Sequence, residues 1–208
     1  MRIRQHVNPL KSDLLSIDVA RVPTPPRTGF LEVELGSGEA HFLMERARAE
    51  PRGTFVGVEI RREMVDRANR ECERAGLSNV RSVFANMSTD MDRLFAPGSV
   101  RRFHVNFPDP WWKSKQRKRR VVGPALVDAM ARALIGDGEV VVATDIFDIA
   151  LDAMACLEHA AFRNVAGPWS FLSESRFAAR SRRERQCEAE GSRIWRLHYQ
   201  RSPGTRPQ

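Results

Sequence analysis

The sequence feature that most constrains the fold is a regular alternation of short apolar runs with longer helical segments between Phe30 and His159. Strands are expected at 30–35, 54–59, 80–85, 100–107 and 139–144, and helices at 39–49, 62–75, 124–134 and 146–159. Because parallel strands need crossover connections, this order predicts an α/β fold, a mostly parallel sheet with helices on both faces. A late stretch, 193–200, alternates apolar and polar residues, which indicates an added antiparallel strand.

The chain of 208 residues is expected to form one domain over 28–201, since this length allows a sizeable core. Residues 1–27 are basic and end in a proline-rich stretch, so we expect a flexible arm there. Residues 202–208 are expected to form a short tail.

The charge balance indicates a polyanionic partner. The chain has 34 basic and 26 acidic residues, a net charge of +8, and no apolar segment near the ~20 residues of a membrane span. We therefore expect nucleic acid rather than membrane as the partner. The three cysteines are scattered and the five histidines lack ligand spacing, which predicts no metal site and fits a reducing cytoplasm.

Ligands of open parallel sheets bind beyond the carboxyl ends of the strands. Here most of the residues expected at those ends carry a side-chain oxygen, and the set is Glu34, Gly36, Gly38, Glu59, Asn86, Asp109 and Asp145. The plainer interpretation of any single one is a solvated strand end, and for Asp145 it is the N-cap of the following helix.

The loop Gly36-Ser37-Gly38 lets a ligand approach the backbone, but His41 stands where a dinucleotide fingerprint has its third glycine. Glu34 also puts negative charge where a pyrophosphate would rest. This pattern disfavours a dinucleotide and favours a ligand with an amine, such as S-adenosylmethionine. Glu59 would then accept from ribose hydroxyls, and Asn86 would lie at the adenine edge.

The most distinctive stretch is Asn106-Phe-Pro-Asp-Pro-Trp-Trp-Lys113, which follows an apolar run. Two prolines hold Asp109 in a stiff turn, and six of the eight residues in 113–120 are basic. A rigid acid, aromatic faces and a basic segment suit a site that holds a nucleobase and grips its phosphates. The alternative is a strand-end turn beside a solvated charge run.

Several motifs together resemble the bacterial tRNA (guanine-N7-)-methyltransferases. They are Glu34-Leu-Gly-Ser-Gly38, Val58-Glu59, Asn79-Val-Arg81, Phe107-Pro-Asp-Pro-Trp111, Lys118-Arg-Arg120 and Thr144-Asp145. The resemblance runs from about Phe30 to Arg201, and its most specific part is the Phe-Pro-Asp-Pro-Trp stretch.

The resemblance implies a Rossmann-like class I methyltransferase fold, S-adenosylmethionine as methyl donor, and a guanosine in the variable region of tRNA as acceptor. It implies donor binding by Glu34, Glu59 and Asn86, and Asp109 at the catalytic centre. It implies substrate contacts at Lys113, Asp145 and the segment 181–184, where Ser181, Arg182 and Glu184 match the family's Thr-Lys-Phe-Glu motif in type or position.

This sequence departs from the family in three places. Asn86 replaces the usual Asp, Arg183 replaces the motif's aromatic residue, and Trp112 stands where Pro or His is frequent. Two alternatives stay open on these grounds: a class I methyltransferase acting on another RNA or a small molecule, and a non-catalytic RNA-binding protein with this fold. No protein partner is expected to be required, and the chain is expected to be a monomer or a homodimer.

Overall fold

The computed structural model describes residues 7–111, 115, 120–158 and 162–202. Its strands are β1 (Phe30–Leu35), β2 (Gly53–Glu59), β3 (Val80–Phe84), β4 (Val100–Asn106), β5 (Leu134–Thr144), β6 (Phe162–Asn164) and β7 (Trp195–Arg201). Its helices are η1 (Ser12–Leu14), α1 (His41–Ala49), α2 (Arg62–Arg74), α3 (Met91–Leu94), α4 (Pro124–Ala133), α5 (Phe147–Leu157) and α6 (Arg182–Ala189).

The strands form one seven-stranded sheet in the order β3-β2-β1-β4-β5-β7-β6. The first five of these strands pair in parallel, and β7 pairs antiparallel with both β5 and β6. This confirms the predicted mixed α/β sheet with its late antiparallel strand. The strand order reverses between β1 and β4, which places the ligand-binding edge at the ends of those two strands.

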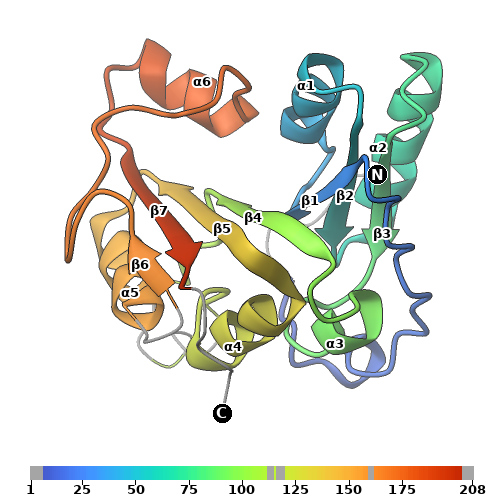
Figure 1. The fold of residues 1–208 in the computed structure, drawn as a ribbon, viewed down its shortest axis with the longest axis horizontal. Coiled ribbons are helices and arrows are strands. Elements are labelled where there is room, and N and C mark those ends of the chain that lie inside the picture. Colours follow the sequence, from blue (N-terminus) through green and yellow to red (C-terminus); the bar gives the residue numbers. More distant parts are fainter. Residues whose placement is uncertain (1–6, 112–114, 116–119, 159–161, 203–208) are drawn as a thin grey trace.

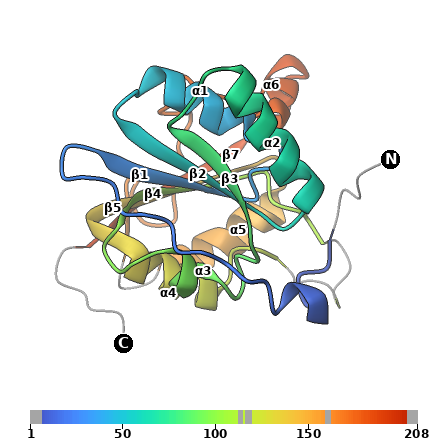
Figure 2. The same cartoon turned by 90° about the vertical axis from the view of Figure 1, so that its right-hand side faces the viewer.

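Helices cover both faces of the sheet. In Figures 1 and 2, α1, α2 and α6 lie on one face, and α3, α4 and α5 lie on the other. Alternation along the strands matches these two layers: Leu31, Val33 and Leu35 of β1 belong to the core that faces α3–α5. Glu32 and Glu34 alternate with them and therefore point to the opposite face.

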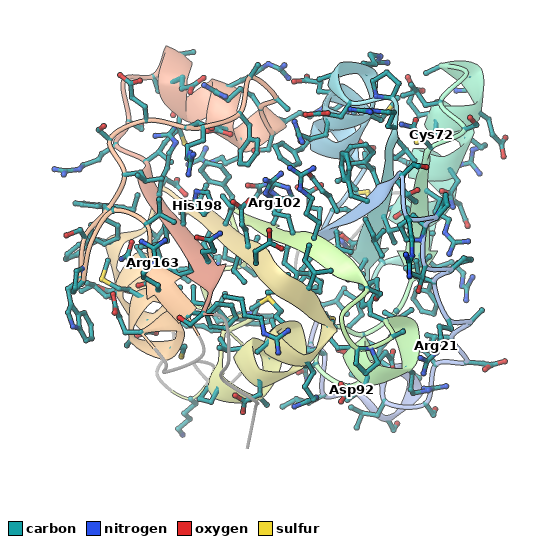
Figure 3. The ribbon with its side chains drawn as sticks, in the orientation of Figure 1. Arg21, Cys72, Asp92, Arg102, Arg163 and His198 are labelled. Carbon is teal, nitrogen blue, oxygen red and sulfur yellow. The ribbon has the colours of Figure 1, made fainter. Side chains whose placement is uncertain are left out.

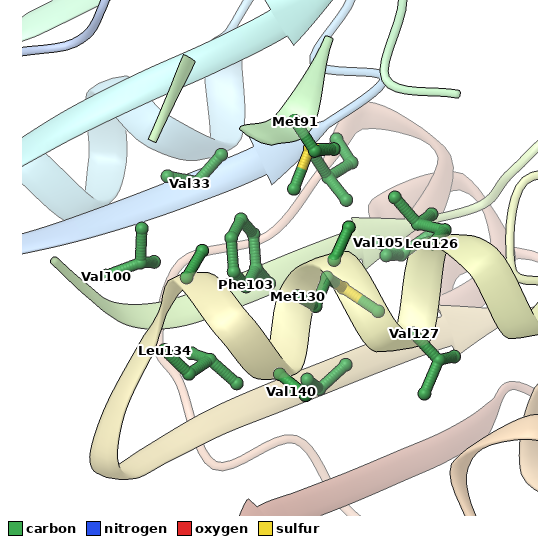
Figure 4. Packing of buried hydrophobic residues seen from close by; sticks show 14 of the residues in the cluster. Val33, Met91, Val100, Phe103, Val105, Leu126, Val127, Met130, Leu134 and Val140 are labelled. Atoms are coloured by element: carbon green, nitrogen blue, oxygen red, sulfur yellow. The ribbon is translucent and has the colours of Figure 1, made fainter. Parts of the chain in front are cut away.

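The main core lies between the sheet and the helices α3, α4 and α5. Figure 4 shows Phe103 and Val105 of β4 packed against Met130 of α4 and Met91 of α3. Phe103 and Met130 have no exposed surface. A second cluster, which includes Leu43 and Phe55, packs α1 and α2 on the other face.

The centre of the α1/α6 face carries a buried charge cluster instead of an apolar core. Glu32 is fully buried and accepts from Arg46 at 3.0 Å and 3.1 Å, from Arg102, and from His104 at 3.0 Å if that ring nitrogen carries the proton. Burial alone would raise the pKa of Glu32, but His104 and the two arginines hold it below its usual range. Figure 3 labels Arg102 of β4 and His198 of β7, which lie on either side of β5 and both contact Glu139 of that strand.

The part of the N-terminal arm that the structure describes does not extend away from the domain. Leu14, Ile17 and Val22 are buried, and the Val22 amide donates to the Leu94 carbonyl at 2.8 Å. In Figure 2 this segment, coloured dark blue, passes beside α3 on its way to β1. Apolar residues spaced along the arm give it a surface to dock, so it differs from the flexible tail expected for residues 1–27.

Two local predictions were wrong. The strand expected at 139–144 begins earlier, because β5 runs from Leu134 to Thr144 with a shift in its pairing to β4. Asp145 is not a helix N-cap: Ile146 holds that position before α5, and no side chain caps it. The weakly patterned region after Phe162 forms β6 and α6, which the sequence did not predict.

Candidate active site

The glycine loop after β1 is shaped by two backbone conformations that favour glycine. Gly36 has φ of 79° and Gly38 has φ of 55°, so L side chains at either position would strain the backbone. The Gly38 amide donates to Glu59 Oε2 at 2.9 Å, which ties the loop to the end of β2. Because neither glycine has a side chain, a ligand at this edge of the sheet can approach the backbone of the loop closely.

Glu59, at the end of β2, is buried and fully engaged. Besides Gly38, its carboxylate accepts from the Arg61 amide at 2.9 Å and from two guanidinium nitrogens of Arg61 at 2.8 Å and 2.9 Å. The Glu59 hydrogen bond raises the pKa of Arg61 despite partial burial, and the charges of Glu59 and Asp109 add to this. Arg61 thus links the two acids electrostatically.

Glu34, near the end of β1, is a buried acid with one oxygen unused. Asn106 of β4 donates Nδ2 to Glu34 Oε1 at 2.8 Å, while Oε2 has no partner among the described residues. Burial raises the pKa of Glu34 to about 8; the Asn106 hydrogen bond opposes the rise and the Glu59 charge adds to it. A cationic group placed at Oε2 would restore the negative charge of this carboxylate.

Asn86, after β3, lines the same edge of the sheet, but its side-chain amide is hydrogen-bonded to other parts of the protein. Its Nδ2 donates to the carbonyls of Pro9 at 2.8 Å and Leu14 at 3.0 Å, and its Oδ1 accepts from the Ser88 amide at 3.0 Å. Both N–H groups of this amide are therefore occupied in this structure, and neither is free to donate to adenine as predicted.

The turn around Asp109 is strained on both sides. Phe107 and Trp111 have φ of 49° and 44°, left-handed values that cost a residue other than glycine about 1 kcal/mol or more. Two contacts hold the turn: the Phe107 amide donates to the Ala143 carbonyl at 2.7 Å, and Arg120 donates to the Pro110 carbonyl at 3.2 Å. The backbone of the turn is thereby fixed where the sequence predicted a rigid acid.

These elements enclose one pocket at the point where the strand order reverses. It contains about 750 Å³, including space open to solvent, and its lining includes Gly36, Glu59, Arg61, Asn86 and Asp109. Glu34 lies beneath it, joined to the lining residue Asn106.

The predicted substrate residues that the structure describes lie outside that pocket's lining. Asp145 accepts from Arg183 at 2.5 Å, so the end of β5 is joined to the start of α6. Ser181 is the N-cap of α6 and accepts from the Glu184 amide at 3.1 Å, which stabilises the helix start. Lys113 falls outside the described residues.

The other two members of the Ser181–Glu184 motif form ion pairs. Arg182 donates to Glu39 at 2.7 Å, and Glu184 is buried and accepts from Arg196 at 2.9 Å. Glu184, Arg196 and Asn106 also line a smaller neighbouring pocket. Because Asn106 lines both pockets, the motif lies beside the Asp109 site without entering it.

Sequence reasoning assigned no role to several residues of the pocket, among them Asn106, Arg61, Val7 and Pro9. Asn106 had a usable signal, since it directly precedes the Phe-Pro-Asp-Pro turn at a strand end. Arg61 follows Glu59 closely, but charge pairs two residues apart occur throughout this chain. Nothing in the local sequence indicates that Val7 and Pro9 return to the ligand edge.

Two arrangements are absent from the residues that the structure describes. These residues contain no group of three or more histidine, cysteine or acidic side chains arranged to hold a metal ion. In the same part of the chain, no helix has both the length and the apolar character to cross a membrane.

Known proteins resemble the chain both in sequence and in fold. A methyltransferase family model, Methyltransf_4, matches residues 29–197. The tRNA (guanine-N(7)-)-methyltransferase of Synechococcus sp. (strain JA-3-3Ab) is 37% identical over 96% of this chain and 86% of its own length. The enzyme of the same name from Synechocystis sp. (strain ATCC 27184 / PCC 6803 / Kazusa) is 34% identical over 98% of this chain and 99% of its own length. A solved SAM-dependent methyltransferase from Aquifex aeolicus superposes with a TM-score of 0.57 at 10% identity over 82% of this chain and 81% of that one, a likeness of fold alone.

Proposed function

Because the chain belongs to the tRNA (guanine-N(7)-)-methyltransferase family, we propose that its strand-end pocket is the site of methyl transfer. The enzyme transfers a methyl group from S-adenosylmethionine to N7 of a guanosine in tRNA. The main support for this location is that three acidic residues, Glu34, Glu59 and Asp109, lie together where the strand order reverses.

The residues of the pocket fit this donor. The unused Oε2 of Glu34 matches the amine of the donor's methionyl part, because a buried acid with a raised pKa regains its charge beside a cation. Gly36 and Gly38 leave room for close approach. The ribose hydroxyls would bind Glu59, which already accepts four hydrogen bonds, so Arg61 must release at least one of them.

The reaction needs charge rather than a base. S-adenosylmethionine supplies an electrophilic methyl group on a sulfonium. Guanine N7 has a lone pair and no proton, so no residue of the chain has to remove one. Positive charge appears on the purine during transfer, and Asp109, fixed by its strained turn, provides the opposing negative charge.

The acceptor would bind on the side of β5 and α6. We assign Asp145 and Glu184 to the amine and imine edge of guanine, with Ser181 holding the start of α6 in place. In this structure Asp145 pairs with Arg183 and Glu184 with Arg196. Substrate binding must therefore open or share these ion pairs. Lys113 and Arg182 are assigned to the phosphates of the tRNA.

Location and assembly are part of the same proposal. The substrate and the three free cysteines, Cys72, Cys156 and Cys187, fit a cytoplasmic enzyme. We expect a monomer or a homodimer, with no other protein required.

Mass spectrometry of nucleosides tests this function. Unmodified tRNA transcripts are incubated with the protein and isotopically labelled S-adenosylmethionine, digested and analysed. We expect label in 7-methylguanosine, and none when the variable-region guanosine is replaced by adenosine. Label in another nucleoside, or transfer that ignores this replacement, would contradict the assignment.

A further inference from the structure

The N-terminal segment 7–17 reaches the donor pocket from a distant part of the sequence. Val7 and Pro9 line the same pocket as Glu59 and Asp109. The segment is anchored below the pocket by Leu14 and Ile17, which are 8% and 6% exposed, while Leu10 and Leu15 are 46% and 45% exposed. One side of the segment therefore packs on the domain and the other faces solvent.

Asn86 is the residue that joins this segment to the pocket wall. It has no exposed surface, and both hydrogens of its Nδ2 are used on the carbonyls of Pro9 and Leu14. Its backbone amide donates to Asp90 Oδ2 at 2.8 Å, and Asp90 Oδ1 in turn accepts from Arg93 at 3.2 Å.

Further contacts continue this attachment along the arm. Arg93 donates to the Ile17 carbonyl at 3.0 Å, and Arg21 donates to the Asp92 carbonyl at 3.4 Å. Figure 3 labels Arg21 and Asp92 at this edge of the molecule. The arm is thus attached to the domain over most of its described length. Asn86 is the buried residue that holds the arm nearest to the pocket.

We propose that residues 7–17 form the outer wall of the S-adenosylmethionine site, and that Asn86 is a positioning residue that acts through this segment. The proposal rests on the proposed function only in naming the donor. Val7 and Pro9 present apolar surface to the pocket, and such surface shields a flat purine ring from water. Asn86 is suited to its role because an amide donates two hydrogen bonds, whereas an ionised carboxylate of the same shape donates none.

The test uses Lys11, which lies between the two anchored carbonyls and is the first of only four lysines in the chain. A protease binds its substrate as an extended segment, so we expect a lysine-specific protease to release the peptide 1–11 fastest when this segment has left the domain. Cleavage is followed by mass spectrometry with and without S-adenosylhomocysteine, whose binding is measured separately by calorimetry. Variants are Asn86→Asp and Leu14→Ala, and Leu15→Ala is the matched exposed control.

In the wild-type protein, saturating S-adenosylhomocysteine is expected to slow cleavage at Lys11 by about tenfold or more. Asn86→Asp removes two donors, so Lys11 cleavage should rise about ten- to thirtyfold and ligand affinity should fall by up to the same factor. Leu14→Ala should change both in the same direction without altering position 86, and Leu15→Ala should change neither.

The outcomes separate this inference from the proposed function. If calorimetry shows tight S-adenosylhomocysteine binding while cleavage at Lys11 ignores the ligand, the segment is not a wall of the site. If Leu14→Ala frees Lys11 but leaves affinity and the KM for the donor unchanged, the segment is likewise excluded. A protein that binds no S-adenosylhomocysteine at all would overturn the proposed function as well.

Discussion

Replacing Glu34 with Gln should make the protein more stable near neutral pH. Glu34 keeps its proton in the folded state because burial raises its pKa from an ordinary 4.5 to about 8. An unfolded chain releases that proton above pH 4.5. Between these values the folded state binds more protons than the unfolded state, so this residue lowers the free energy of unfolding as the pH rises.

The size of the effect follows from the two pKa values. Each pH unit between 4.5 and 8 lowers the free energy of unfolding by about 1.4 kcal/mol, so at pH 7 Glu34 has lowered it by about 3 kcal/mol. The amide of Gln keeps an acceptor for Asn106 and cannot ionise, so the variant does not lose this stability. The difference between the two proteins should be small at pH 5 and near its maximum at pH 8.

Urea unfolding of both proteins at pH 5, 6, 7 and 8 measures that difference. Glu71→Gln is the matched control, because Glu71 lies on α2 with 52% of its side chain exposed. A stability difference between wild type and Glu34→Gln that stays flat from pH 5 to 8 would refute the raised pKa, and with it the reason for placing a cation there.

Three further predictions concern the donor, the reaction and the RNA. Binding of S-adenosylhomocysteine at pH 7 should release close to one proton from Glu34, measured by calorimetry in buffers of different ionisation enthalpy; an equal heat in all buffers contradicts this. Asp109→Asn should lower the single-turnover rate by about 10²–10³ with little change in donor affinity, and near-normal turnover would exclude Asp109 as the stabilising charge. Changing Lys113, Lys115 and Lys118 together to Gln should flatten the salt dependence of tRNA binding by about two to three in log–log slope, whereas an unchanged slope would leave these lysines without phosphate contacts.

The predictable part of the fold was the part governed by periodicity. The strands from β1 to β4 and the helices α1, α2, α4 and α5 lie within a few residues of their predicted ranges, since apolar runs and glycine turns determine them locally. The Asp109 turn could likewise be predicted as rigid from its two prolines. Its left-handed residues, Phe107 and Trp111, could not, because no local rule favours that conformation for aromatic side chains.

The rest depended on contacts between distant residues. Glu32, Arg102 and His104 interrupt apolar strands, and only the folded sheet shows that they neutralise one another in the interior. Asn86 was expected to bind adenine from its place in the sequence, but its amide binds the Pro9 carbonyl, 77 residues away. Residue propensities alone predict a flexible tail for the arm, because the backbone carbonyls that anchor it carry no sequence signal.

We propose that the strand-end pocket directs a methyl group to N7 of one guanosine in tRNA. The most direct measurement is transfer of labelled methyl to a tRNA carrying 7-deazaguanosine only at the acceptor position, where a C–H replaces N7. We expect transfer to disappear while tRNA binding, followed by filter retention, remains within about twofold of the unsubstituted tRNA. Continued transfer to the substituted tRNA at the normal rate would contradict it.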